Sequence, residues 1–535
     1  MSQNMDNRRA GSGVAEGNGD ILLQIWRRIP SHIKWCFCSG FLSGLLVHAY
    51  MLTNKLPNWD DINNLGGYGV GSEFGRWFLK YVNPLDGVWS VPWLGGIFSI
   101  ALISVAGCML LSALELRSTT SAILVPLMMM SFPSMCSLFT FMFTADCYAV
   151  GILFACTAAW LIRKYRFGFI PGIVLLVLSM GIYQAYLCLA LGILVCGLFF
   201  DLLKEKNEKR IFVKGLWAFL ILVISAVIYM ALARLIYPDL GSQNGLDQMG
   251  RIELSRLPRL ILRAYKWVAE YFILKPWSYV TGFVWFLNVL SALAAAGFVI
   301  FSFFRGKFWK KPVAAALFVF LAAAIPLAMG SIIIMAPDAS VSLLMLYQFH
   351  LLYVFVIAML EKTQLSGSEK KQKMVRLIGP AVVVLILLVG YQNFVVTNEA
   401  YFRMDVAYER AYAYYNRIMA RIEATEGYQT GDAIALIGEY GLSKTPDLLG
   451  SYSLDGERYE DLSGVAKETG LLTSGVRHNF MKTYIGVEMP DVSAETEAAI
   501  RASEEYQNMP SYPAEGCVKQ IEGVWVVKTC EETLE

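Results

Sequence analysis

The chain has 535 residues, of which 56% are apolar and only 16% are charged, whereas soluble proteins have roughly 25% charged residues. Residues 1–397 carry 33 Lys and Arg against 19 Asp and Glu, and residues 398–535 carry 12 against 24. This uneven charge excludes a nucleic-acid binder. It favours a polytopic membrane protein with an acidic soluble tail.

A membrane-spanning helix requires about 20 mainly apolar residues. Segments of this kind lie near 33–53, 89–112, 119–137, 144–162, 212–236, 278–304, 312–335, 339–360 and 377–397. The apolar segment 168–200 is too long for one crossing, because at about 1.5 Å per residue it would reach roughly 50 Å across a hydrocarbon layer of about 30 Å. We expect it to form two short helices that turn near 182–185.

The basic residues predict the orientation, since short cytoplasmic loops collect Lys and Arg. They form five clusters between the apolar segments: Arg27, Arg28 and Lys34; Arg163, Lys164 and Arg166; 204–210; 305–311; and 362–376. All five lie inside only if segment 168–200 crosses twice. The sequence therefore predicts about eleven crossings, with the N-terminus cytoplasmic and the C-terminus outside.

Three regions follow from this topology. Residues 1–31 form a disordered cytoplasmic N-terminus without a cleavage site after the first apolar segment, which acts as an uncleaved anchor. Residues 32–397 form a mainly α, polytopic membrane helical bundle. Residues 398–535 form a small extracytoplasmic α/β domain.

The tail has its own pattern of elements. An amphipathic helix is expected over 399–425, strands over 433–437 and 525–527, and a helix near 493–506 that begins with Ser493 as N-cap. Cys517 and Cys530 both lie in this exported region, where conditions favour oxidation. We expect them to form a disulfide, although an exported thiol pair can also stay reduced.

The first outer loop contains an adjacent pair of acids, Asp60 and Asp61, between Trp59 and a Gly-rich stretch that ends in Gly75-Arg76-Trp77. At a membrane interface, desolvation and mutual repulsion can raise one carboxyl pKa toward the working range of a general base. The two tryptophans would anchor the loop at headgroup depth. The alternative is an N-capping Asp that opens an interfacial helix.

Asp146 is a second candidate acid. It follows a Pro-broken span and opens the next one, so the topology returns it to the outer face beside the first loop. An ionisable group at that depth is costly unless it is used or paired. The alternative is again an N-cap.

The second long outer loop supplies cations. In a helix with Pro258 in its first turn, Arg256, Arg259 and Arg263 share one face. Guanidinium groups in this arrangement suit a phosphate, because they donate bidentate, charge-assisted hydrogen bonds to its oxygens. An amphipathic helix whose arginines contact lipid headgroups is an equal alternative.

Other chemistry has little support. Tyr183 and Gln184, at the turn of the two short helices, could bind a sugar hydroxyl or satisfy a helix end. Four histidines and the cysteine spacing provide no metal site, and no phosphate-binding glycine loop, nucleophile elbow or HExxH motif occurs.

These features resemble those of the type II bacterial glucosyltransferase family, which are membrane-embedded glycosyltransferases of the GT-C kind. The resemblance covers residues 35–400 approximately, and its strongest elements are Trp59-Asp60-Asp61-Ile62, Gly75-Arg76-Trp77 and Tyr183-Gln184-Ala185-Tyr186. Members modify O-antigen and related surface glycans. The resemblance does not extend diagnostically to the tail.

The resemblance implies that a sugar, glucose in this family, moves from a polyprenyl-phosphate donor to a cell-surface glycan acceptor outside the bacterial plasma membrane. Asp60 or Asp61 would be the base, and Asp146 matches the second acidic position less closely. Arg76, Arg256, Arg259 and Arg263 become candidates for the donor phosphate, and Trp59, Tyr183 and Gln184 for the sugar. No cofactor is expected, and a divalent metal is not excluded.

Two other functions fit a membrane protein of this kind. A lipid-linked glycan flippase or transporter would require charged or polar residues through the middle of the membrane and related halves, whereas this sequence has few central charges and no obvious repeat. A membrane-anchored sensor would have its site in the exported tail and no need for Asp60 and Asp61.

Overall fold

The computed structural model describes residues 21–529 apart from 66–70, 72–73, 84–86, 88, 206, 239–254, 276, 365–368, 439–457, 466–467 and 491. Several predictions concern residues outside this part of the chain. They include the disordered N-terminus, the Gly-rich residues 66–70 and Cys530. The disulfide between Cys517 and Cys530 therefore stays a prediction.

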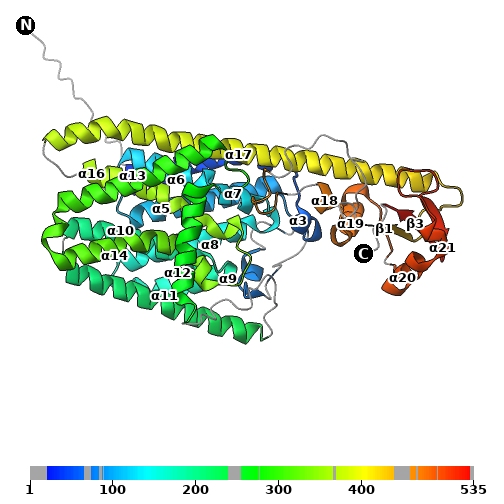
Figure 1. Ribbon diagram of the computed structural model, residues 1–535, viewed down its shortest axis with the longest axis horizontal. Coiled ribbons are helices and arrows are strands. Elements are labelled where there is room, and N and C mark those ends of the chain that lie inside the picture. The colour runs from blue at the N-terminus through cyan, green and yellow to red at the C-terminus, as the bar shows by residue number, and fades with distance from the viewer. Residues whose placement is uncertain are drawn as a thin grey trace, which may run out of the picture.

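Most of the described chain forms a bundle of apolar helices (Figure 1). Its long helices are α2 (Ser31–Thr53), α5 (Pro92–Ala113), α8 (Ala145–Lys164), α10 (Tyr186–Glu205), α11 (Glu208–Ile236), α13 (Gly282–Gly306), α14 (Pro312–Met329) and α17 (Glu369–Glu423). A further span joins the 3-10 helix η7 (Leu343–His350) to α16 (Leu351–Gln364). The fold class is thus confirmed as a polytopic helical bundle.

Two further apolar segments are shorter or broken. The helices α6 (Thr119–Ser131) and α7 (Pro133–Phe139) meet at a bend of 54° and can form one span together. The apolar helix α9 (Phe169–Ile182) ends at the predicted turn, and α10 begins four residues later. Within the described residues, nine helices are long and apolar enough to cross a membrane, and the bent pair raises the number to ten. The eleventh crossing, assigned to α9 from the basic residues, stays a prediction.

Shorter elements connect the bundle helices. They are α1 (Ile21–Arg28), α3 (Trp59–Asn63), α4 (Leu79–Val82), η3 (Met142–Thr144), α12 (Leu257–Ala269), the π-helix η5 (Glu270–Leu274), η6 (Phe308–Lys310) and α15 (Ile332–Met335). Helix α12 runs across the bundle helices rather than along them (Figure 1).

Helix α17 differs from the sequence prediction. A membrane span over 377–397 and a separate amphipathic helix over 399–425 were expected, but one continuous helix of 55 residues covers both. At about 1.5 Å per residue it reaches roughly 80 Å, so it leaves the bundle and continues along the tail (Figure 1). The helix therefore does not end near residue 398, where the sequence predicted a domain boundary. At this point its neighbours change from the helices of the bundle to the elements of the tail.

The tail contains a three-stranded sheet with the order β1-β3-β2. Strand β1 (Ile434–Ile437) is parallel to β3 (Val524–Lys528), and β2 (Val518–Ile521) is antiparallel to β3. The helical elements are α18 (Glu468–Leu471), α19 (Ser474–Phe480), the π-helix η8 (Met481–Ile485), α20 (Ala494–Ala502) and α21 (Glu504–Gln507). Ser493 caps α20 as predicted by accepting a hydrogen bond from the Thr496 amide.

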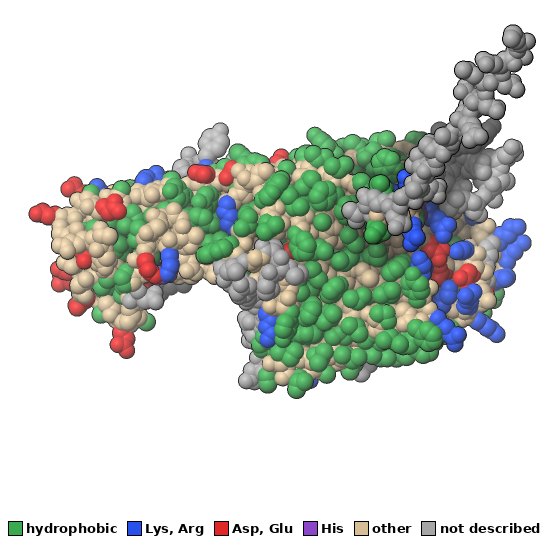
Figure 2. All heavy atoms as spheres, turned by 180° about the vertical axis from the view of Figure 1, so that it is seen from behind, with side chains coloured by type: hydrophobic (Ala, Val, Ile, Leu, Met, Phe, Trp, Pro, Cys, Tyr) green, Lys and Arg blue, Asp and Glu red, His purple; other side chains and the backbone are tan. Residues whose placement is uncertain are grey.

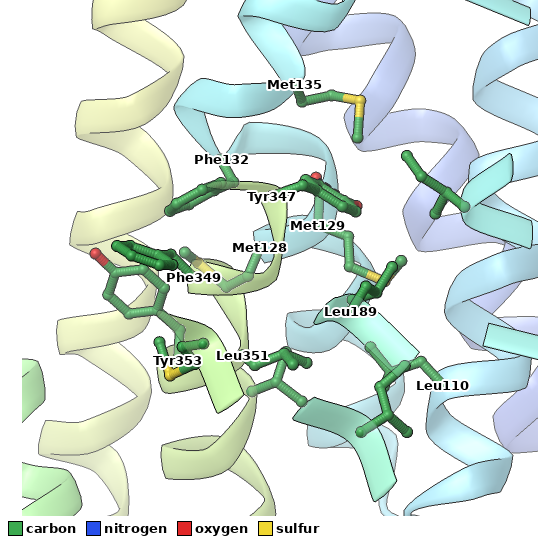
Figure 3. Packing of buried hydrophobic residues seen from close by; sticks show 14 of the residues in the cluster. Leu110, Met128, Met129, Phe132, Met135, Leu189, Tyr347, Phe349, Leu351 and Tyr353 are labelled. Carbon is green, nitrogen blue, oxygen red and sulfur yellow. Dashed lines mark hydrogen bonds between the residues drawn. The ribbon is translucent and has the colours of Figure 1, made fainter. Parts of the chain in front are cut away.

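The core of the bundle is apolar and densely aromatic. Phe132 at the α6–α7 bend packs near Tyr353, and Tyr347 and Phe349 of η7 lie beside Met128 and Met129 of α6 (Figure 3). These contacts hold the bent pair against η7 and α16. The bend is thereby covered by protein, as non-helical backbone at membrane depth requires.

The two ends of the molecule carry different charge. Apolar side chains cover the bundle surface, Lys and Arg gather at the end away from the tail, and Asp and Glu dominate the tail (Figure 2). We refer to these two ends of the bundle as the tail end and the far end. Helix α3 and the loop around Arg76 lie at the tail end.

Candidate functional site

The short helix α3 carries both acids of the loop between α2 and α5. Its N-cap is Asn58, whose side chain accepts a hydrogen bond of 2.9 Å from the Asp61 amide, while the Asp61 carboxylate accepts one from the Asn58 amide at 3.5 Å. These two bonds form a capping box. The N-cap of α3 is therefore Asn58 and neither of the two aspartates, and Asp61 completes the capping box as its N3 residue.

Asp61 also joins α3 to the start of α8. Its second carboxylate oxygen accepts a hydrogen bond of 3.0 Å from the Phe143 amide in η3, and the Asn58 side chain donates to the Thr140 carbonyl at 2.8 Å. The Asp61 side chain is completely buried. Burial raises its pKa to about 6, against the opposing effects of Lys55 and the backbone donors.

Asp60 lies on a different face of the same helix. It is half-buried, and within the described residues its carboxylate makes no hydrogen bond. Burial raises the pKa of Asp60, and the positive charge of Arg76 lowers it in part. Of the two acids, Asp60 is thus the one whose carboxylate is available for chemistry.

Arg76 provides the cation beside Asp60. Its guanidinium stacks on the Tyr183 ring at 5.0 Å from the centroid and approaches the Tyr148 hydroxyl at 3.5 Å. Its Nε is buried without a hydrogen-bond partner, and it has no ion pair within 4.0 Å among the described residues. The cation is therefore held mainly by aromatic rings, and part of its hydrogen-bonding capacity is unused.

Residues 74–78 hold Arg76 against the Tyr183 ring. The Gln184 side chain donates to the Phe74 carbonyl at 2.7 Å, and the Tyr229 hydroxyl donates to the Gly75 carbonyl at 3.1 Å. Gly75 has φ +82°, and a Cβ there would lie 2.6 Å from the Tyr229 hydroxyl. Glycine is required at this position both by the backbone angle and by the lack of space.

The two tryptophans of the first loop pack into protein. Trp77 is buried against Gly181 and in a cluster with Val177 and Tyr229, so its predicted place among lipid headgroups is wrong. Trp59 is half-buried, and its ring lies 3.5 Å from the position of a Cβ on Gly470 in α18. Trp59 is therefore in contact with the tail.

Asp146 lies in the first turn of α8, with Thr144 at the N-cap. Its side chain is buried, at 1% exposure. The Phe143 amide that bonds Asp61 comes only three residues earlier. The fold thus brings the start of α8 beside the first loop, as the topology predicted.

The arginines of α12 have other partners. Arg256, just before the helix, forms a two-fold hydrogen-bonded ion pair with Asp338 at 2.6 and 3.1 Å, and Arg263 donates to the Pro337 carbonyl at 2.8 Å. Arg259 is exposed. Pro258 occupies the first turn as predicted, and Leu260 and Ala264 bury the other face. Two of the three arginines thus fasten α12 to the loop after α15.

The sequence singled out Tyr183 and Gln184 at the α9–α10 turn but did not indicate three neighbouring groups. Tyr148 comes from α8 and Tyr229 from α11, and both are buried next to Arg76. Lys55 donates to the Ser90 carbonyl at 3.0 Å, and burial lowers its pKa while Asp61 raises it. Because these residues come from distant segments, no local pattern connects them.

Among the residues that the structure describes, no three His, Cys, Asp or Glu side chains come together as a candidate metal site.

The fold and the site define a polytopic membrane protein with an available carboxylate and a cation at one end of its helical bundle. The family model described as glucosyl transferase GtrII matches residues 49–360. This match covers more than half of the chain, so the chain belongs to that family and is a membrane glycosyltransferase. The resemblance seen in the sequence is confirmed. No curated protein and no solved structure matches the chain.

Proposed function

We propose that this glycosyltransferase moves a sugar, glucose by its family, from a polyprenyl-phosphate donor to a cell-surface glycan acceptor on the outer side of the bacterial plasma membrane. Asp60 is the general base and Arg76 binds the donor phosphate. The observation that carries this proposal is that Asp60 and Arg76 both lie at the tail end and are near enough for the charge of Arg76 to lower the pKa of Asp60. Among the described residues, the Asp60 carboxylate accepts no hydrogen bond and the Arg76 guanidinium has no ion pair.

The choice of Asp60 over Asp61 follows from what each carboxylate already does. Both oxygens of Asp61 accept backbone hydrogen bonds, and its side chain is inaccessible to a substrate. A general base must come within hydrogen-bond reach of the proton that it removes. Asp60 satisfies this condition, and its raised pKa moves it toward the range in which a base is efficient.

Arg76 suits the phosphate of a lipid-linked donor. A guanidinium donates up to five hydrogen bonds, and the described structure uses few of them at Arg76. The rings of Tyr148, Tyr183 and Tyr229 keep water away from one side of the cation. A lipid phosphate at the headgroup plane would then gain a stronger electrostatic interaction than it has in water.

The α12 arginines suit a different role in this proposal. Arg256 and Arg263 are engaged with the 337–338 loop, and α12 lies across the bundle with Arg259 exposed. In this proposal Arg256, Arg259 and Arg263 hold α12 at the level of the outer lipid headgroups, where amphipathic helices place their cations.

In the proposed reaction, Asp60 takes the proton of an acceptor hydroxyl as its oxygen attacks the anomeric carbon of the donor. The bond between the anomeric carbon and the phosphate oxygen breaks through an oxocarbenium-like state. The bonding electrons leave with the polyprenyl phosphate, and Arg76 stabilises the negative charge that develops on it. Tyr183 and Trp59 are the candidates for contacts with the sugar, and Gln184 keeps the Arg76 loop in place.

The charge distribution supports the orientation. Lys and Arg gather at the far end (Figure 2), which supports a cytoplasmic position for that end under the positive-inside rule. The tail end, with α3 and Arg76, is then extracytoplasmic, where lipid-linked sugars and surface glycans meet.

The experiment that tests the function uses the full chain in lipid vesicles, with polyprenyl-phosphate-glucose as donor and isolated surface glycan as acceptor. We expect Asp60→Asn to reduce transfer by about 100-fold or more, the range of general base catalysis. Asp61→Asn, which keeps one acceptor oxygen, is the matched control and should remain within about tenfold of the unchanged protein. Full transfer by the Asp60→Asn protein would overturn the proposed role of Asp60.

A further inference from the structure

A short segment of the tail is inserted into the tail end of the bundle. Tyr459, Leu462 and Val465 are buried in the main bundle core. We call residues 459–465 the docking segment. Its neighbour on the bundle side, Ser278, exchanges two hydrogen bonds with Asp461, one from each backbone amide to the other side chain.

The docking segment contacts the residues that hold α3. The Thr140 hydroxyl donates to the Ser463 carbonyl at 2.9 Å, and Thr140 is also the residue whose carbonyl accepts from Asn58, the α3 N-cap. Gly464 has φ +81°, and a Cβ there would lie 2.1 Å from the Thr140 hydroxyl oxygen and 3.0 Å from the Asn58 side-chain nitrogen. Only glycine fits between the tail and the cap of α3.

A second part of the tail lies against α3 itself. Trp59 faces Gly470 of α18, Ile62 is buried in the tail core, and Asn63 accepts a hydrogen bond of 2.9 Å from Asn479 of α19. Positions 59, 62 and 63 share one face of a helix. Asp60 lies outside this set of positions, and the charge of Arg76 is near enough to lower its pKa.

These contacts matter because α3 has only five residues. A helix this short does not persist on its own, because nucleation is costly and few internal hydrogen bonds form. The orientation of Asp60 therefore depends on the neighbours of α3. These neighbours include the docking segment, α18 and α19, which all come from the tail.

We propose that the tail is a positioning element of the catalytic site, in which the docking segment and α19 hold α3, and with it Asp60, in place at the tail end of the bundle. This inference rests on the proposed role of Asp60. Gly464 acts as a positioning residue, because it allows the tail to approach the α3 cap. A misplacement of about 1 Å in a catalytic group can reduce the rate about 100-fold, so a displaced α3 should lower kcat.

The test compares two glycine substitutions in the full chain. Gly464→Ala introduces strain at a positive φ and a collision with Thr140. Gly523→Ala introduces similar backbone strain at φ +76°, but its Cβ would meet nothing within 4 Å. Both variants are purified in detergent, checked for a monodisperse folded state, and measured for kcat, for donor KM and for amide hydrogen exchange in the peptide that contains 58–63.

We expect Gly464→Ala to lower kcat at least tenfold, with a smaller change in donor KM, and to accelerate exchange at the Asp61 and Ile62 amides, which bond to Asn58. Gly523→Ala should leave both quantities within twofold. A folded Gly464→Ala protein with normal kcat and normal exchange at α3 would overturn the inference, as would equal effects of the two variants.

A second variant covers the case in which Gly464→Ala does not accumulate. Asp461→Asn removes the charge from the bond to the Ser278 amide without filling any space, and should produce a weaker form of the same result. Asp60→Asn separates the two proposals. If it retains activity, the proposed function fails, whereas if it is inactive and Asp461→Asn changes neither kcat nor exchange at α3, only the positioning role fails.

Discussion

The carboxylate of Asp61 accepts the backbone hydrogen of Phe143 at 3.0 Å, and this bond joins α3 to η3, just before α8 and 82 residues later in the chain. The same carboxylate closes the capping box with Asn58. Asp60, its neighbour in sequence, makes no such bond within the described structure. The two acids therefore have separable roles, one holding the loop and one available to a substrate.

This separation predicts that alanine substitutions of the two acids differ in their effect on stability. Asp61→Ala would leave the buried amides of Phe143 and Asn58 without acceptors, at about 1–3 kcal/mol for each buried unsatisfied group. We expect a clear loss of thermal stability in detergent. Asp60→Ala removes a carboxylate without hydrogen bonds and should change the unfolding temperature little. Equal stability of the two alanine variants would contradict the assignment.

Arg76 provides the second prediction. Replacement by Lys keeps the charge but loses the planar donor geometry and the stacking on Tyr183. We expect both Arg76→Lys and Arg76→Met to raise the donor KM and lower transfer by at least about tenfold, as loss of a charge-assisted contact of about 1.5–3 kcal/mol implies. Arg76→Met should fold normally, because it removes a part-buried cation that has no ion pair. Arg76→Lys with full activity would contradict bidentate phosphate binding.

A third prediction concerns the loop that presents Arg76. Gly75→Ala should strain the backbone and push the Tyr229 hydroxyl away, so transfer should fall at least tenfold. The double variant Gly75→Ala, Tyr229→Phe removes the colliding oxygen and should recover part of the loss. Gly87→Ala, at φ +108° with no atom of the described residues within 4 Å of its Cβ, is the control for strain alone. An equal loss in the Gly87 variant would remove the specific role of Gly75.

Much of the bundle could be predicted from the sequence. Long apolar segments identify the bundle helices, and the limit that the bilayer sets on helix length indicates the turn between α9 and α10. Ser493 and the apolar segment 433–437 likewise indicate a cap and a strand through local chemistry. Caps, strands and apolar helices depend on residues that are close together in sequence or on the membrane itself. A local stretch of sequence is therefore enough to predict them.

The continuity of α17 and the site itself could not be predicted in this way. The apolar pattern ends near residue 397, but a change of surroundings does not interrupt a helix, so α17 continues to Glu423. The partners of Arg76 come from α8, α11 and the α9–α10 turn, and Gly464 meets Thr140 across more than 300 residues. Such contacts depend on tertiary packing, and no local pattern in the sequence indicates them.

The pH dependence of transfer gives a final prediction, with its sign fixed by two named effects. Burial raises the pKa of Asp60 above the ordinary value for aspartate, and the positive charge of Arg76 opposes this rise. As the base, Asp60 must be ionised, so kcat/KM should increase with pH across that raised pKa. In Arg76→Gln the opposing charge is absent, so the pKa of Asp60 rises further and the acid limb of the profile should move to higher pH.

The control is Arg234→Gln, which removes an exposed arginine from the tail end of α11 and should leave the acid limb in place. A limb that stays fixed or moves to lower pH in Arg76→Gln would show that the titrating group is not next to Arg76, and Asp60 would lose its role as the base.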